Sequence, residues 1–192
     1  HNSTRMVETA WSTTTTFTIG RDWLPGLYLA ASVASDGTYE NVYPLVVTAP
    51  LGSTPLLLVN STMTWEAYNQ FGGRSAYTGP ISNAKEKSSI VSFDRPFIGS
   101  GMRHIFRDAV AFTQFLEKSN IAVSQNTDIN LSNSPSIISH YNGIFFGGHA
   151  EYFTNRLFHS VIAARNTGVN IAWFGANNAY WQDRKSTRLN SS

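Results

Sequence analysis

A histidine and a carboxylate directly follow an apolar run, and both side chains could take part in catalysis. The stretch GIFFGGHAEYF (143–153) places His149 and Glu151 directly after two glycines. Histidine changes charge near neutral pH, so it could carry protons beside an acid. The same acid could also favour a helix N-terminus by about 0.3–1 kcal/mol without any function. The pair indicates either an active-site cluster or the polar start of the next helix.

The apolar run before this pair belongs to a series of expected strands. Short continuous apolar segments bounded by turn residues are typical of buried strands. They occur at 56–60, 120–125, 142–148 and 169–175.

Two helices are expected between these strands. Apolar residues recur at helical spacing over 104–119, and a second helix is expected over 155–168. Thr154 is a plausible N-cap and Gly168 a plausible stop for the second helix. Apolar strands alternating with helices predict a mainly parallel α/β sheet.

Polar side chains follow each expected strand at the point where it ends. Parallel strands end at one edge of a sheet, and α/β proteins bind ligands beyond that edge. The stretches that follow are rich in aromatic, amide and acidic residues, and they span 61–77, 126–128, 149–153 and 176–181. We call each of these stretches the exit of its strand. Four such exits on one edge of the sheet predict a functional site there.

The expected architecture has three parts. Residues 51–182 should form an α/β domain with a flavodoxin- or amidotransferase-like sheet and helices on both faces. Residues 1–50 should supply the last strands of a truncated, Ig-like β-sandwich, with strands over 12–19, 26–34 and 39–47 and a turn at SDGT (35–38). Residues 183–192, DRKSTRLNSS, match the translation of a common sequencing adapter, so we expect a disordered artefact.

Composition excludes several classes of function. The chain has no cysteine, which rules out disulfides, thiolate metal sites and a cysteine nucleophile. Its net charge of +2 falls to zero without the last ten residues, so we expect no nucleic-acid partner. No apolar run approaches the roughly 18 residues of a membrane span. We expect a cytoplasmic protein, and secretion stays open because the sequence begins at His1 without an initiator methionine.

Four motifs in order resemble the large-subunit catalytic region of N,N-dimethylformamidase and its relatives. They are LLLVNSTMTWEAYNQFGGRSAY, VSFDRPF, GGHAEYFTNRL and AARNTGVNIAWFGANNAYWQ. The resemblance implies an amidohydrolase that splits an N-substituted formamide into formate and an amine. It also implies a small subunit as partner, and a homo-oligomer stays open.

The same resemblance implies a mononuclear iron site held by two tyrosinates and one glutamate. By motif, the ligands would be Tyr28, Tyr68 and Glu151, with His149 and Asn177 as catalytic neighbours. Such hard, anionic oxygen donors suit a hard cation such as Fe³⁺. His149 could then move a proton to the leaving amine, and Asn177 could hydrogen-bond the developing oxyanion.

One position departs from the family pattern. The family commonly reads Gly-His-Asp-Glu-Tyr-Trp where this chain has Ala150 between His149 and Glu151. If the missing acid orients or charges the site, the substrate range would change.

Two other functions stay open. The β-region, the aromatic exits and the low charge would also suit a non-catalytic ligand- or carbohydrate-binding module. A metal-free hydrolase of the amidotransferase type ranks lower, because that class uses a cysteine after a strand. For Asp94-Arg95 in FDRPF, a structural ion pair or loop anchor is favoured over catalysis.

Overall fold

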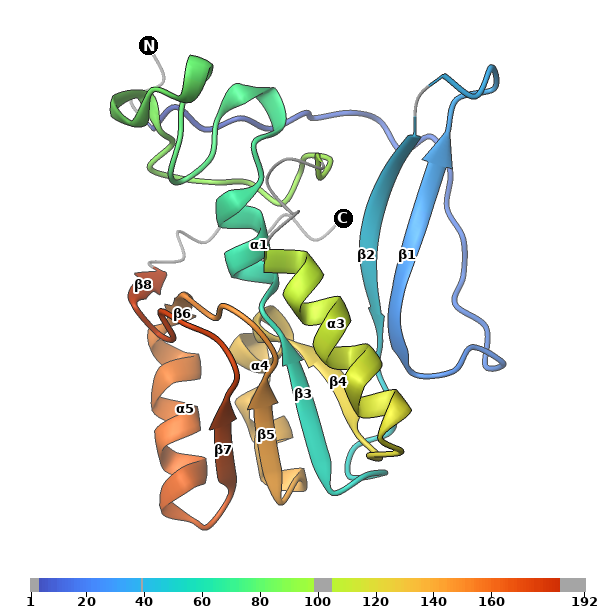
Figure 1. The fold of residues 1–192 in the computed structure, drawn as a ribbon, viewed down its shortest axis with the longest axis vertical. Helices are drawn as coiled ribbons and strands as arrows, with labels where there is room; N and C mark the ends of the chain where they lie inside the picture. The colour runs from blue at the N-terminus through green and yellow to red at the C-terminus, as the bar shows by residue number, and fades with distance from the viewer. Residues whose placement is uncertain (1–3, 39, 99–104, 184–192) are drawn as a thin grey trace.

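A four-stranded parallel sheet is the centre of the molecule. The computed structural model describes residues 4–38, 40–98 and 105–183. Strands β3 (Leu56–Asn60), β4 (Ser124–Thr127), β5 (Gly143–Phe146) and β7 (Asn170–Trp173) are arranged as β4-β3-β5-β7, with every pair parallel (Figure 1). The predicted α/β class is therefore confirmed. Its finer description as flavodoxin- or amidotransferase-like stays a prediction.

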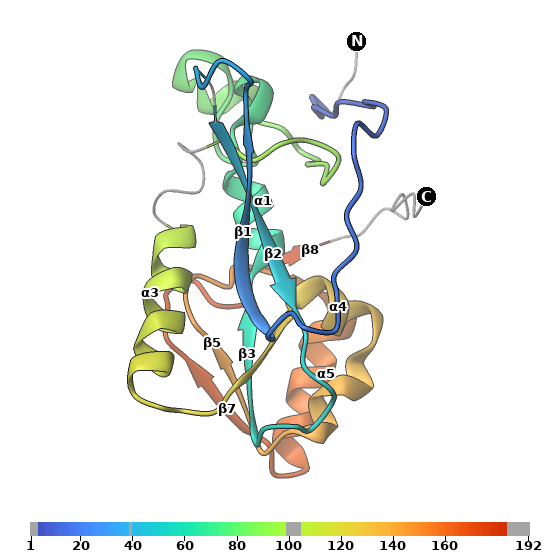
Figure 2. The same ribbon diagram turned by 90° about the vertical axis from the view of Figure 1, so that its right-hand side faces the viewer.

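Helices cover both faces of this sheet (Figure 2). One face carries α3 (Ile105–Lys118), and the other carries α4 (Asp128–Asn133), the 3-10 helix η4 (Pro135–His140) and α5 (Asn155–Asn166). Leu57, Leu58 and Val59 of β3 are all buried, as expected for a central strand covered on both sides. The main core forms between the sheet and the second helical layer, where Ile144, Phe146 and Leu157 are fully buried.

The ends of the predicted helices agree with the structure. Thr154 caps α5, because its side-chain oxygen accepts a hydrogen bond from Leu157 N–H at 3.1 Å. Gly168 follows the helix with φ of 100°. The predicted strand at 120–125 begins late, at Ser124. Asn120 has φ of 53° and Ile121 N–H bonds back to Leu116 C=O at 3.0 Å, so these residues close α3.

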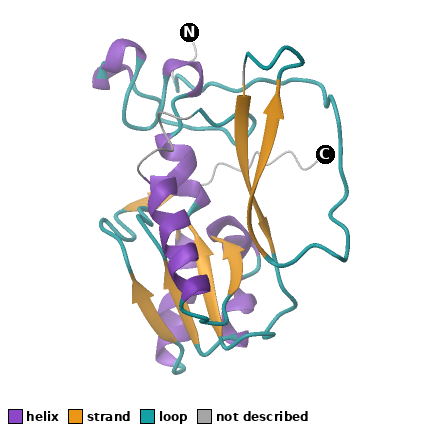
Figure 3. Ribbon diagram, turned by 45° about the vertical axis from the view of Figure 1, so that its right-hand side comes forward, coloured by secondary structure: helices purple, strands orange, loops and turns teal. Residues whose placement is uncertain are grey.

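The N-terminal part contains one antiparallel hairpin, β1 (Gly26–Val33) with β2 (Glu40–Val47), which stands beside the sheet (Figure 3). Gly37, with φ of 72°, lies in the predicted turn. The strand predicted over 12–19 is wrong: this stretch is irregular and exposed. β-branched residues favour strands only where a neighbouring strand packs against them, and none of the described strands pairs with this stretch. The Ig-like sandwich stays a prediction.

The C-terminal part adds a small parallel pair that the sequence did not predict. It joins β6 (Tyr152–Thr154) to β8 (Trp181–Asp183). The rest of the predicted artefact, 184–192, lies outside the described residues. Within the described ranges, the helices are too short or too polar to cross a membrane.

A buried carboxylate fixes the helix that leaves β3. Helix α1 (Thr62–Tyr68) has no side-chain cap of its own. Asp128, which is fully buried at the start of α4, accepts hydrogen bonds from the N–H groups of Thr62 and Met63, each at 3.0 Å. This contact ties the exits of β3 and β4 together.

Asp128 makes stability depend on pH. Burial raises the pKa of Asp128 from 3.8 to about 7, against the opposing effect of its hydrogen bonds. The folded chain therefore binds this proton more tightly than the unfolded chain, so the Asp128 contribution is lost as the pH rises from about 4 through 7. Between about pH 4 and pH 7, the free energy of unfolding of the wild type, measured relative to that of Asp128→Asn, should fall by up to about 1.4 kcal/mol per pH unit. Urea denaturation at pH 5 and pH 8 checks this, and equal pH dependence of both proteins would contradict it.

Candidate functional site

The candidate site lies where the parallel strands end. Glu151 leaves the β5 exit with only 2% of its surface exposed. Its N–H donates to Thr64 Oγ1 at 2.9 Å, and its C=O accepts from Trp181 N–H at 2.8 Å. Thr64 also accepts from Tyr152 N–H at 3.3 Å. Helix α1 and strand β8 thus hold the Glu151 backbone from two sides.

Replacing Thr64 by valine should destabilise the chain and displace Glu151. Valine keeps the shape but cannot accept the bonds from the Glu151 and Tyr152 N–H groups, and each buried group left unmet costs about 1–3 kcal/mol. Thr113→Val is the matched control, because Thr113 is also buried in a helix but only donates to Ala109 C=O. Thermal denaturation of both variants checks this, and equal losses would show that the acceptor role is unimportant.

Two phenols meet the Glu151 carboxylate. Tyr68 donates to Oε1 at 2.8 Å, and Tyr77 donates to Oε2. The two rings stack with centroids 4.2 Å apart. Burial is the main cause, and the hydrogen bond to Glu151 the second, of a raised pKa at both phenols. The pKa of Tyr68 rises to about 12, and that of Tyr77 rises further. Both phenols therefore keep their protons at neutral pH in this structure.

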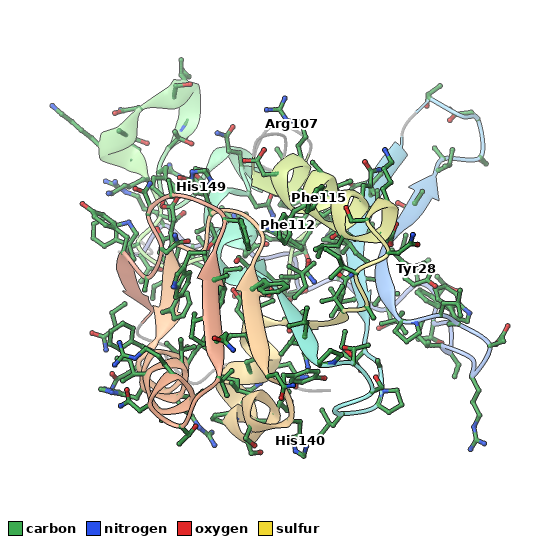
Figure 4. The ribbon with its side chains drawn as sticks, turned by 60° about the horizontal axis from the view of Figure 1, so that its bottom comes forward. Tyr28, Arg107, Phe112, Phe115, His140 and His149 are labelled. Atoms are coloured by element: carbon green, nitrogen blue, oxygen red, sulfur yellow. The ribbon has the colours of Figure 1, made fainter. Side chains whose placement is uncertain are left out.

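His149 lies two residues before Glu151, beside helix α3 (Figure 4). Its Nδ1 atom is buried without a hydrogen-bond partner and lies 4.0 Å from Asp108 Oδ2. A Cβ at Gly175 would lie 2.8 Å from the His149 backbone nitrogen, so only glycine permits this close approach of the β5 and β7 exits.

A recess opens at the carboxyl ends of β3 and β5. It is lined by residues at the ends of both strands and by Trp65, Ala109 and His149. The strand order reverses between β3 and β5, and ligands of open α/β sheets bind at such a point. His149 thus lines the recess and stands two residues before the Glu151 carboxylate.

The other two predicted residues are not joined to this cluster by a hydrogen bond. Tyr28 lies on the hairpin, well separated from His149 in Figure 4, and its hydroxyl donates to Leu24 C=O at 2.7 Å. Asn177 is exposed in the loop after β7, with φ of 56°. Asparagine tolerates this left-handed backbone better than most residues, which is reason enough for its presence. The proposed roles of Tyr28 and Asn177 stay predictions.

Sequence reasoning missed three residues around this site: Tyr77, Thr64 and Asp108. Tyr77 follows a 3-10 segment and a turn, where no periodicity gives its direction. The SAY stretch (75–77) ends the first of the four motifs, so a second tyrosine near Tyr68 was the available signal. Nothing in the sequence joins Thr64 to Glu151 or Asp108 to His149.

The donor chemistry suits a hard metal ion. Among residues 4–38, 40–98 and 105–183, no group of three or more His, Cys, Asp and Glu side chains could hold a metal. The oxygens that converge here come instead from two phenols and one buried carboxylate. Phenolate and carboxylate oxygens are ligand types that suit Fe³⁺, so the site could hold this ion once at least one phenol loses its proton.

Comparison with known families decides the relationship. The family described as N,N-dimethylformamidase beta subunit-like, C-terminal, matches residues 1–191. The chain belongs to this family. The resemblance inferred from the four motifs is therefore confirmed. No curated protein matches the chain.

Membership of the N,N-dimethylformamidase-like family makes Ala150 informative. Its side chain is 1% exposed and packs in the main hydrophobic core. An acid at this position would place a charge in this apolar core, which is costly unless the charge is paired. Alanine therefore suits the surroundings that the structure provides.

Proposed function

We propose that the chain is the catalytic region of an iron-dependent amidohydrolase. Its substrate would be a small N-substituted amide of the formamide type, cleaved to a carboxylate and an amine. The family name supports a link to such an enzyme. The observation that carries the proposal is the buried Glu151 carboxylate, which meets two phenols at the sheet edge that binds ligands in this class of fold.

Tyr68 and Glu151 would hold a single ferric ion, with Tyr28 as the third ligand that the resemblance implies. When bound, the ion would polarise the amide carbonyl and lower the pKa of a bound water.

The chain's own residues would bind the amide and move its protons. His149 would hold a proton and deliver it to the leaving nitrogen, and Asp108, 4.0 Å away, would stabilise the charged imidazole. Trp65 would line the recess against the N-substituents. The Asn177 amide would donate to the developing oxyanion once its exposed loop turns toward the recess.

The test is iron loading of the purified full chain followed by an amide assay. We expect about one ferric ion per chain, a visible tyrosinate-to-iron charge-transfer band, and release of formate and dimethylamine from N,N-dimethylformamide. A colourless, metal-free protein after loading would overturn the proposal. The family name refers to a subunit. The amide assay should therefore be repeated on the intact protein, with its small subunit present and in its own oligomeric state.

Exposed aromatic residues favour a second function, a non-catalytic ligand- or carbohydrate-binding module. Trp11, Phe17 and Trp23 are exposed before the hairpin, and Trp181 is exposed in β8. This alternative expects ligand binding without amide turnover, and binding that survives Glu151→Ala. Isothermal titration with soluble oligosaccharides, using both proteins, separates it from the enzyme.

A further inference from the structure

Tyr77 has a distinct place in the cluster, because it occupies the carboxylate oxygen that Tyr68 leaves free. Tyr68 donates to Glu151 Oε1 at 2.8 Å, whereas Tyr77 donates to Oε2. Their rings stack at 4.2 Å, so the two phenols reach the carboxylate side by side. Each oxygen of a single buried carboxylate therefore has its own donor.

The backbone around Tyr77 is fixed on the helix that carries Tyr68. Ala76 N–H donates to Ala67 C=O of α1 at 2.9 Å. Ser75, which is 1% exposed, accepts from the N–H groups of Tyr77 and Thr78 at 3.1 and 3.0 Å. These bonds hold the Tyr77 phenol in place before any ligand arrives.

We infer that Tyr77 is a positioning residue that keeps Glu151 Oε2 hydrogen-bonded, so that Glu151 binds the metal through Oε1 alone. This inference rests on the proposed iron site. A metal that took both oxygens would have to break the charge-assisted bond from Tyr77, which is stronger than a neutral one. Oxygen ligands of metals are commonly held by such outer partners, whose removal lowers metal affinity roughly 10–100-fold.

The test compares ferric-iron binding by the full-length chain with binding by Tyr77→Phe. We expect binding to weaken roughly 10–100-fold while the charge-transfer band remains, because Tyr77 does not supply the tyrosinate. Infrared difference spectra of iron binding should show the wide carboxylate splitting of one-oxygen ligation in wild type. The splitting should narrow in Tyr77→Phe, where both oxygens become available.

Tyr141→Phe is the matched control. Tyr141 is 4% exposed and precedes β5, at the opposite edge of the sheet from Glu151. This variant should keep wild-type affinity, band and splitting. If Tyr77→Phe does not fold, Ser75→Ala loosens the same turn and should reproduce a smaller loss of affinity.

The outcomes are distinct. Unchanged affinity and splitting in Tyr77→Phe would overturn the inference, and so would loss of the band, which would make Tyr77 a ligand. Wild-type protein that binds iron with the expected splitting but turns over no amide would overturn only the proposed function. Wild-type protein that binds no ferric iron would overturn both.

Discussion

Glu151→Gln should abolish ferric-iron binding and, with it, the charge-transfer band and amide hydrolysis. Among the described residues, Glu151 supplies the only carboxylate that accepts hydrogen bonds from both Tyr68 and Tyr77. Glutamine keeps the size and one acceptor oxygen, so Tyr68 retains a partner, but the negative charge that attracts Fe³⁺ is gone. The loss of affinity should exceed the roughly 100-fold upper range for an outer-shell partner. Iron titration followed by absorbance measures this directly.

The fold should survive this substitution. The backbone contacts of Glu151 with Thr64 and Trp181 do not involve the carboxylate. Glu117→Gln, on the exposed side of α3, is the matched control and should leave iron binding unchanged. A Glu151→Gln protein that keeps the wild-type band would contradict the role of the carboxylate.

The sequence predicted best those elements whose signals are local. LLLVN is apolar throughout and bounded by turn residues, so β3 was placed at Leu56–Asn60. The Thr154 cap and Gly168 located both ends of α5. Thr-rich 12–19 also favours a strand, but none of the described strands pairs with it, and propensity without packing does not make a strand.

The site was predictable only in part for a related reason. The parallel order brought the exits of β3 and β5 together, and Tyr68 does reach Glu151. Tyr77 reaches the same carboxylate because a turn is bonded to α1, and such contacts leave no periodic trace in sequence. The hydroxyl of Tyr28 donates a hydrogen bond to Leu24 C=O, so the position of Tyr28 in a motif did not predict which groups surround it.

Arg95→Met should strongly destabilise the chain, because it leaves Glu66 buried without its ion-pair partner. Both side chains are fully buried. The guanidinium also donates to five backbone carbonyls, of Glu66, Asn69, Phe71, Arg74 and Ser92. These bonds anchor the segment that leads from α1 to Tyr77, which agrees with the loop-anchor interpretation of FDRPF. Removing one partner of a buried pair costs about 3–5 kcal/mol.

The effect of Arg95→Met should grow with pH. Burial raises the pKa of Glu66 from 4.5 to about 7, and Arg95 opposes this rise. The raised pKa means that the Glu66 contribution to stability is present below about pH 4.5 and is lost as the pH rises through 7. Without Arg95, the pKa of Glu66 should rise further, so the gap from wild type should be larger at pH 8 than at pH 5. Denaturant-induced unfolding of both proteins at pH 5 and pH 8 measures this difference in stability.

Two variants show whether the buried pair is responsible for this loss. Arg74→Met breaks a partly exposed ion pair with Glu86, which should contribute no more than about 1 kcal/mol, and one hydrogen bond from the guanidinium to Glu86 C=O. Glu66→Met combined with Arg95→Met removes both charges and should recover part of the stability lost in Arg95→Met alone. If the double variant is less stable than Arg95→Met, the loss comes from the missing carbonyl bonds rather than from an unpaired Glu66. In that case Arg95 acts mainly as the anchor of the segment from Asn69 to Tyr77.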